Sequence, residues 1–479
     1  MNNPRKKLKD MPLMLKATIV FAISNFATSG INYITTPIFT ELLSTAEYGT
    51  VAVYNSWFDI VKVFATMTLI YPGVLNVGLY DHKDNRWKYL SSMLGITTFC
   101  TLVLGALYAI FFGAVNSAMG LPPSLVILML LTSVFTPATI FWTFKQRYEY
   151  AYKIAFYVSV GSAVFAQIAS IMAVIFAKNN GVANLAEVRL WSAGIFNIAV
   201  AIVIFAYICI KGKCFLDFSI WKPTFLVALP LIPHYLGSVV LSSTDKIMID
   251  RMVSGEKAGI YSLAAILSAI GVLLWRALSV TFTPFVNAKL GERDFCSIRS
   301  AVKPLLTMVG LACVIASLAA PEIIKILATD EYLEGVYVVP PIAAGIFIHA
   351  LYDNFSAVSF FHKKSVRIMT ATLTAAVINI VLNYLFIKNF GFIAAGYTTL
   401  ISNIVLSGMH YYNTRKIEKE KVYDFKFSCI ATLLVTLGCL ACNLCYEINI
   451  LRYALILCVL AVMALKAKSV VKAIVDMKV

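Results

Sequence analysis

Charged side chains lie inside long apolar stretches of this sequence, where they could hold ions. One stretch carries Asn55, Asp59, Lys62 and Thr66, and this spacing puts all four on one face of a helix, with an acid and a base one turn apart. A charge inside an apolar helix is costly, so it is expected to face a cavity or a partner. Asp59 and Lys62 either neutralise each other or contact a ligand.

Other acids and a histidine in apolar stretches could carry protons. Asp245 and Lys246 lie near the end of one stretch, where solvation is cheap, and His349 and Asp353 lie one turn apart in another. For Asp245 a structural role is the alternative, and for His349 a hydrogen bond between helices. The ion-coupling candidates are Asp59, Asp245, His349 and Asp353.

Arg276 lies about ten residues from either end of its apolar stretch, too deep to reach the membrane surface easily. Arginine stays charged in proteins, so it requires an anion nearby. Asp59 or Asp353 could supply the anion, and so could a phosphate group of a ligand, with Lys62 as a second cation.

Uncharged polar side chains recur at helical spacing in the same stretches and could line a cavity for a polar ligand. Asn379 and Asn383, in the apolar stretch 367–387, could line such a cavity or could form a contact between helices. The predicted cavity residues, besides Arg276 and Lys62, are Asn25, Asn32, Asn55, Ser242 and Ser279.

The composition indicates which kind of fold holds these residues in place. The chain has 479 residues, of which 60% are hydrophobic and only 13% charged, and its mean hydropathy is +0.82. A soluble domain carries about twice that charged fraction, so we predict an all-α polytopic membrane protein. The net charge of +16 comes from short basic clusters between apolar stretches, which is typical of membrane topology and not of nucleic-acid binding.

No motif for catalysis, metal or nucleotide binding stands out. Cys442 and Cys445 form a lone C-x-x-C, and the sequence has no Walker A motif and no metal-ligand spacing. Nor does any stretch read as a large soluble domain. We therefore predict no enzyme activity and no cofactor, and transport driven by an ion gradient.

Apolar stretches of about twenty residues are long enough to span a membrane, and we count fourteen. They cover about 17–43, 50–78, 89–115, 124–143, 154–177, 191–210, 224–250, 258–286, 304–320, 335–361, 367–387, 396–413, 427–446 and 450–466.

The positive charges predict the orientation of these spans. With the N-terminus inside, thirty Lys and Arg fall in inner loops and tails, seven in outer loops and three within spans. This bias predicts that both termini are cytoplasmic.

An offset of 210 residues aligns similar loops. It places Lys178-Asn179 on Lys388-Asn389, and Ser44 and Gly49 on Ser254 and Gly259. We therefore predict a parallel repeat of two six-helix lobes, with two extra helices at the C-terminal end; chance similarity of loops is the alternative. The predicted domains are residues 1–210, 211–423 and 424–479.

Several motifs resemble one family of transporters. They are the turn Leu42–Gly49, the segment from Pro230 through Asp245–Ile249 to Gly259–Ala264, and the segment from Asn379–Asn383 to Gly391–Thr399. They are similar to the Wzx-type polysaccharide repeat-unit (O-antigen) flippases of the multidrug/oligosaccharidyl-lipid/polysaccharide exporter (MOP) superfamily. The likeness in layout covers spans 1–12.

The resemblance implies two lobes that open alternately to either side of the bacterial inner membrane. The cargo it implies is an undecaprenyl-pyrophosphate-linked oligosaccharide, with Arg276 and Lys62 on the pyrophosphate and polar walls around the sugar. Implied partners are membrane lipid, protons or sodium, a polysaccharide polymerase and a chain-length regulator. A fourteen-helix layout also resembles peptidoglycan-precursor flippases, in which the extra pair helps hold the lipid tail. A cation-coupled multidrug exporter of the same superfamily is the alternative.

Overall fold

A computed structural model describes residues 13–268 and 270–477, and all regular elements in these ranges are helices. Nine of the described helices are long and apolar enough to cross a membrane, and eleven if each of two sharply bent pairs counts as one span. The prediction of an all-α polytopic membrane protein is confirmed.

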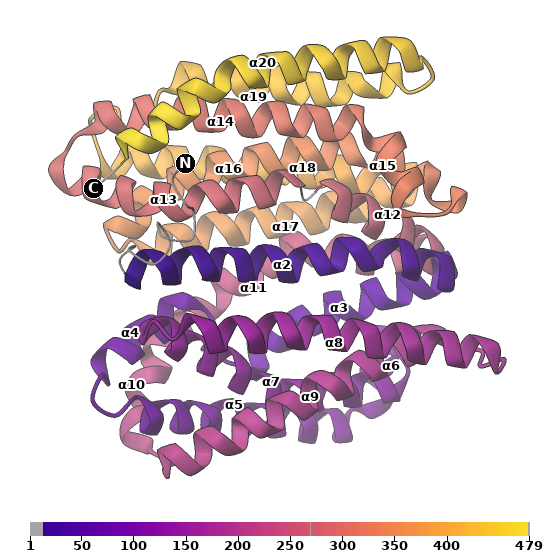
Figure 1. The fold of residues 1–479 in the computed structure, drawn as a ribbon, viewed down its shortest axis with the longest axis vertical. Coiled ribbons are helices and arrows are strands. Elements are labelled where there is room, and N and C mark those ends of the chain that lie inside the picture. The colour runs from indigo at the N-terminus through magenta and orange to yellow at the C-terminus, as the bar shows by residue number, and fades with distance from the viewer. Residues whose placement is uncertain (1–12, 269, 478–479) are drawn as a thin grey trace, which may run out of the picture. The chain divides into compact units, whose positions relative to one another are not determined.

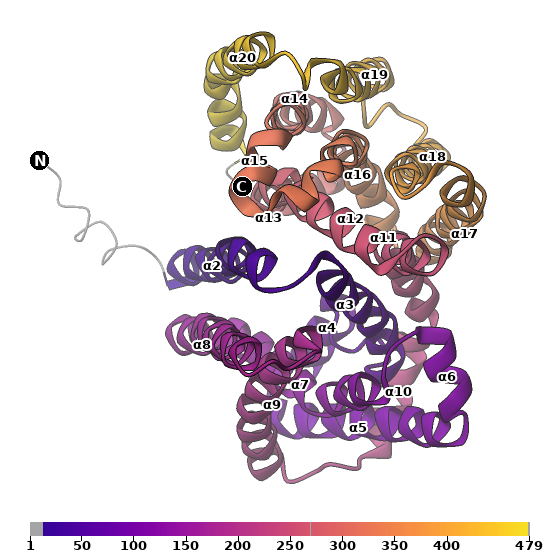
Figure 2. The same ribbon diagram turned by 90° about the vertical axis from the view of Figure 1, so that its right-hand side faces the viewer.

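The chain divides after Leu236 into two compact units. In unit 1, α7, α8 and α9 pack on one another, α2 lies against α8, and α5 packs on α7 and α9 (Figure 2). Its helices are α2 (Leu13–Leu42), α3 (Thr45–Ala65), α4 (Pro72–Asp81), α5 (Arg86–Ile110), α6 (Phe112–Met119), α7 (Pro123–Tyr148), α8 (Tyr152–Asn179), α9 (Leu185–Gly212), α10 (Phe218–Ala228) and the 3-10 turn η1 (Leu229–Leu231).

In unit 2, α16 is the central helix and contacts α12, α13, α14, α17, α18 and α19 (Figure 1). The last two helices of the chain, α19 and α20, both pack on α14. The helices are α11 (Ile232–Met252, which begins in unit 1), α12 (Gly255–Ser268), α13 (Ile270–Glu292), α14 (Phe295–Leu318), α15 (Ala320–Leu327), η2 (Asp330–Tyr337), α16 (Val339–Phe361), α17 (Ser365–Phe390), α18 (Ala394–Ile417), α19 (Phe425–Ala441), η3 (Cys442–Cys445) and α20 (Asn449–Asp476).

The turn between α2 and α3 shows why the sequence ends one helix and starts the next there. Ser44 caps α3: its Oγ accepts a hydrogen bond from the Glu47 amide at 3.2 Å, and Glu47 Oε2 accepts one from the Ser44 amide at 2.9 Å. Glu47 Oε1 also accepts a hydrogen bond from the Leu185 amide at 2.9 Å. The same glutamate therefore joins the starts of α3 and α9.

The stretch 50–78, predicted as one span, is broken between α3 and α4. Met67 and Thr68 have positive φ values of 48° and 60°, and the Thr68 hydroxyl donates to the Ala228 carbonyl oxygen at 3.4 Å. The ring of Tyr71 stacks on that of Tyr235, with centroids 3.8 Å apart. Tertiary contacts hold this turn in place, and an apolar sequence pattern does not reveal them.

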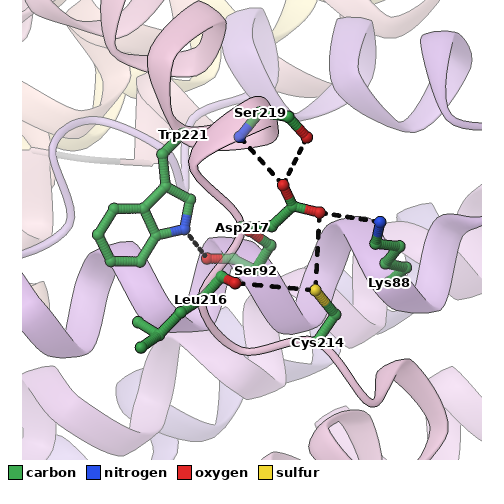
Figure 3. Close-up of polar contacts among 7 residues, drawn as sticks. All are labelled: Lys88, Ser92, Cys214, Leu216, Asp217, Ser219 and Trp221. Carbon is green, nitrogen blue, oxygen red and sulfur yellow. Dashed lines mark hydrogen bonds and ion pairs between the residues drawn. The ribbon is translucent and has the colours of Figure 1, made fainter.

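The link from α9 to α10 is fastened to α5 by polar contacts (Figure 3). Asp217 caps α10 through a 3.0 Å hydrogen bond from the Ser219 amide, and its other carboxylate oxygen lies 2.9 Å from the Lys88 ammonium nitrogen. One turn on, Trp221 Nε1 donates to the Ser92 carbonyl oxygen at 3.1 Å. The hydroxyl of Ser219 and the Lys88 ammonium hold the pKa of the Asp217 carboxyl well below its usual range.

Candidate functional site

Asp245 lies in the middle of a polar cluster inside unit 2. Its side chain, on α11, is only 3% exposed. Oδ2 accepts hydrogen bonds of 2.6 Å from both the Tyr261 and the Thr399 hydroxyls, and Oδ1 accepts one of 2.7 Å from Asn383 Nδ2. All three of these donors are neutral, so they orient the carboxylate without cancelling its charge.

A second layer of hydrogen bonds fixes the residues around Asp245. Asn383 Nδ2 also donates to Asn379 Oδ1 at 3.2 Å, and Asn379 Nδ2 donates to Thr399 Oγ1 at 3.1 Å. The Thr398 hydroxyl donates to Asn383 Oδ1. Asn379 and Asn383 therefore connect α17 to α18, and Asn383 reaches α11 as well.

The motifs that carried the family resemblance meet at this cluster. Asp245 comes from α11, Tyr261 from α12, Asn379 and Asn383 from α17, and Thr399 from α18. In the sequence, Asp245 and Thr399 are separated by 154 residues. Sequence reasoning named Asp245 as an ion-coupling candidate but missed Tyr261 and Thr399 as its partners; their place in the motifs was the only signal.

A cavity of about 280 Å³ adjoins the cluster, and two other predicted site residues line it, Ser242 and His349. Asp353 lies one turn beyond His349, with 3.9 Å between its Oδ1 and His349 Nε2, and its Oδ2 accepts a 2.7 Å hydrogen bond from Trp275 Nε1. The structure thus brings Ser242, Asp245 and His349 around one cavity. Asp353 and His349 are both more than a third exposed, unlike Asp245.

Arg276 is exposed on α13. Among the residues that the structure describes, no hydrogen bond or ion pair is found for its guanidinium group, so Asp353, an acid of the same unit, is not its partner there. Its neighbour Ser279 points its hydroxyl at the Trp275 carbonyl oxygen, 2.8 Å away. An exposed arginine on a helix of an apolar chain is suited to binding an anion.

In unit 1, Lys62 Nζ lies 2.8 Å from Asp59 Oδ1 on the same face of α3. Asn55 lies on the same helix and is exposed. The acid and base are therefore paired with each other, as one of the two sequence interpretations expected.

The other two predicted asparagines contact polar residues of neighbouring helices. Asn25 Oδ1 accepts a 3.5 Å contact from Arg147 Nη2, and Asn32 Oδ1 accepts a 3.1 Å hydrogen bond from Gln167 Nε2. Asn25 and Asn32 are both exposed on α2. Their amides form an exposed polar edge in unit 1. Sequence reasoning did not name Arg147 or Gln167, whose helices are far along the chain from α2.

A bound metal would need several close ligands. Within the described residues, no group of three or more His, Cys, Asp or Glu side chains could hold a metal ion. The oxygen-rich surroundings of Asp245 suit a proton or a hard monovalent cation.

Comparison with known proteins decides the family. Residues 14–285, more than half of the chain, match the polysaccharide biosynthesis protein family. The chain belongs to this family. A search of curated proteins finds no match.

Solved structures show which fold this family member has. It is similar to the lipid II flippase MurJ in an inward closed conformation, with a TM-score of 0.65 and 15% identity over 93% of this chain and 98% of MurJ. An inward-facing MATE-family multidrug resistance transporter of the MOP superfamily is similar with a TM-score of 0.58 and 15% identity, over 85% of this chain and 98% of the transporter. A MOP transporter from Pyrococcus furiosus, described as having a binding pocket of reverse polarity, has a TM-score of 0.52 and 15% identity, over 86% of this chain and 97% of the transporter.

These neighbours are transporters and a flippase, and the chain shares their fold, as the predicted resemblance implied. The family member is a multi-pass membrane protein with the fold of MOP flippases and transporters. At 15% identity the likeness establishes the fold alone.

Proposed function

We propose that this protein is a flippase that moves undecaprenyl-pyrophosphate-linked oligosaccharide repeat units from the cytoplasmic to the periplasmic leaflet. One observation carries the proposal: a chain of the polysaccharide biosynthesis family has the fold of the lipid II flippase MurJ. The protein would lie in the bacterial inner membrane with both termini in the cytoplasm. A polymerase and a chain-length regulator would receive its product.

The chemistry of the cargo matches the polar residues found. A pyrophosphate is bound well by an arginine fork, and Arg276 is exposed and has no carboxylate partner among the described residues. Lys62 is paired with Asp59, so we assign it a secondary role in binding the pyrophosphate. Sugar hydroxyls would hydrogen-bond to Asn25, Asn32, Asn55, Ser242 and Ser279.

Transport against a gradient requires coupling, and Asp245 is the best-placed of the four candidates. It is buried and held by three neutral donors, whereas Asp59 already has the Lys62 ammonium and Asp353 and His349 are partly exposed. A buried carboxylate is costly, so binding a proton or a sodium ion lowers that cost. Cation binding at Asp245 would thereby bias the two states of an alternating-access cycle.

A cation-coupled multidrug exporter is the second candidate, favoured by the MATE-like fold and by a buried carboxylate beside a cavity. An exporter would change the resistance of cells to cationic drugs and would leave lipid-linked sugars unaltered. The two candidates therefore differ in a measurable product.

The deciding experiment uses a deletion strain of the source bacterium. Undecaprenyl-linked oligosaccharide is measured in the membrane and polymer at the surface, and a periplasmic glycosidase reports the leaflet. We expect linked units to accumulate in the cytoplasmic leaflet and surface polymer to be lost. Accumulation in the periplasmic leaflet would identify a polymerase defect instead, and unchanged lipids with altered drug resistance would favour the exporter.

Complementation then tests Arg276. Arg276→Gln should restore surface polymer poorly, because it removes the cation proposed for the pyrophosphate. The matched control is Lys466→Gln, which removes one exposed positive charge on α20 and should complement fully. Full complementation by Arg276→Gln would rule out this arginine as the pyrophosphate ligand.

A further inference from the structure

A large basic pocket lies in unit 2, away from Asp245 and its cavity. It has a volume of about 1040 Å³ and forms where the α13–α14 loop meets the segment between α18 and α19. Six basic side chains line it against three acidic ones. The basic residues are Arg293, Arg299, Arg415, Lys419, Lys421 and Lys426.

Most of these cations are not neutralised by the protein. Arg293 is paired with Glu420 at 2.8 Å. The other five have no ion pair among the residues that the structure describes. Arg299 donates to the Lys421 carbonyl oxygen, and Arg415 donates to the Lys419 carbonyl oxygen at 3.0 Å. These contacts order the loop and leave the positive charges in place.

Two helices begin at the pocket, and each is capped by an aspartate of the lining. Asp294 accepts a 3.1 Å hydrogen bond from the Ser297 amide at the start of α14, and Asp424 accepts one of 3.1 Å from the Phe427 amide at the start of α19. These two carboxylates are already used by the helix ends, so the surplus of basic side chains decides the charge of the pocket. It favours a group with more than one negative charge, such as a phosphate.

An apolar groove of about 460 Å³ starts at the wall of this pocket. Tyr411 and Phe425 line both spaces, and their rings stack with centroids 4.7 Å apart. From there the groove follows α16, α18 and α19 as far as Thr436; α18 and α19 both pack on α16 (Figure 2). At about 1.5 Å per residue, Phe425 to Thr436 spans about 16 Å, close to half of the ~30 Å hydrocarbon core of a bilayer.

We infer that the pocket and groove together bind an anionic phospholipid, with its phosphate among the lysines and arginines and an acyl chain along α19. The groove is as long as one leaflet is thick, which fits an ordinary acyl chain. The basic loops lie on the side that the distribution of lysine and arginine assigns to the cytoplasm, where anionic lipids attract basic segments. The site is separate from the proposed cargo and coupling residues, so it stands whether or not the proposed function does.

The test measures binding of dioleoyl phosphatidylglycerol and dioleoyl phosphatidylcholine to the purified full-length protein by native mass spectrometry. The phosphatidylglycerol should bind about tenfold more tightly or better, given the attraction expected for each lysine. A triple variant, Lys419→Gln/Lys421→Gln/Lys426→Gln, should lose most of this preference. These three exposed side chains make no ion pair among the described residues, so folding should survive.

The matched control removes three exposed lysines from α20, as Lys466→Gln/Lys468→Gln/Lys472→Gln. It changes net charge equally and should keep the lipid preference. Equal loss of preference in this control would overturn the inference, because general surface charge would then explain it.

The groove is tested by Gly408→Phe. A Cβ at Gly408 meets no atom within 4 Å, so a large side chain can enter the groove without displacing the helix. It should weaken both lipids several-fold, whereas Gly161→Phe, at a glycine of α8 with equally open space, should weaken neither. Inorganic phosphate is the last probe: if it displaces phosphatidylglycerol at equal concentration, and Gly408→Phe has no effect, the site binds a free anion and the lipid inference is wrong.

Discussion

Asp245→Asn separates a coupling role for this residue from a purely structural one. The substitution keeps the shape of the side chain and removes its charge. An amide has one acceptor oxygen and one donor group. If the oxygen takes the position of Oδ2, it keeps the hydroxyl donors of Tyr261 and Thr399, and its NH₂ then faces Asn383 Nδ2, which donates to Oδ1 in the wild type.

The geometry gives the size of the effect on stability. Hydrogen bonds to a charged group are about twice as strong as neutral ones, so the two retained bonds weaken by about 1 kcal/mol each. The lost third bond costs about 1–3 kcal/mol more. Against this, the variant avoids the desolvation of a buried charge, which is several kcal/mol. Because these terms oppose each other, we expect the unfolding free energy to change by less than about 2 kcal/mol.

The dependence on cations should change far more. A cation that binds only the folded protein stabilises it by about 2.7 kcal/mol at one hundred times its dissociation constant. Asp245→Asn should remove this whole term, because the carboxylate that would bind the cation is gone. Cation dependence is therefore a sharper readout than stability.

Thermal unfolding of the purified protein measures this dependence of stability on cations. Sodium is titrated against choline at constant ionic strength, and pH is titrated at constant sodium. The wild type should be stabilised by one of the two cations and Asp245→Asn by neither. Asp59→Asn and Asp353→Asn are the controls and should keep the wild-type response. A folded Asp245→Asn protein with the full response would refute the assignment.

Two further predictions concern stability. Asp217→Asn should lower the unfolding temperature by the same amount from about pH 8 to pH 5: the folded-state pKa of this carboxyl is depressed, so its stabilisation is present above its ordinary pKa and is lost only as pH falls below that value. A difference that vanishes between those pH values in circular dichroism melts would contradict this. Arg452→Gln should lower the free energy of unfolding by about 2–3 kcal/mol, measured with denaturant. The buried Arg452 side chain binds Glu322, Asn449 and the Tyr446 carbonyl oxygen, and Glu322 is 30% exposed. The control Lys466→Gln should leave the free energy of unfolding unchanged. Equal losses of stability in the two variants would count against a stabilising role for the Arg452 contacts.

Local features of this protein could be predicted from the sequence, and contacts between distant helices could not. The Asp59–Lys62 pair follows from a spacing of three residues on one helix and is found at 2.8 Å. The hydrogen bond from Thr399 to Asp245 depends on how α11 and α18 register against each other, which composition and periodicity do not determine. The break after α3 was missed for the same reason, since contacts with Ala228 and Tyr235 hold it.

The roles of the predicted binding residues, the domain boundaries and the repeat remain predictions, because no contact in the structure tests them. What the geometry adds is a ranking. Arg276 ranks above Lys62 for an anion because Lys62 already has the Asp59 carboxylate. Asp245 ranks above Asp353 for a cation because it is buried and oriented by three donors.

The offset of 210 residues predicts that unit 2 has a cation site at Asp245 and that unit 1 has none at the equivalent position. It places Asp245 on Thr35 and Thr399 on Arg189. In unit 1 the Arg189 guanidinium lies 3.8 Å from the centroid of the Phe39 ring and 5.3 Å from that of Tyr48. Under the predicted repeat, the equivalent position would serve packing in unit 1 and would hold the carboxylate in unit 2. Arg189→Gln should lower the unfolding free energy by about 1–2 kcal/mol through the lost cation–π contacts, and the response to sodium or pH should stay that of the wild type. Loss of that response in a folded Arg189→Gln protein would mean that coupling is not confined to Asp245, and the asymmetry argued from the offset would be wrong.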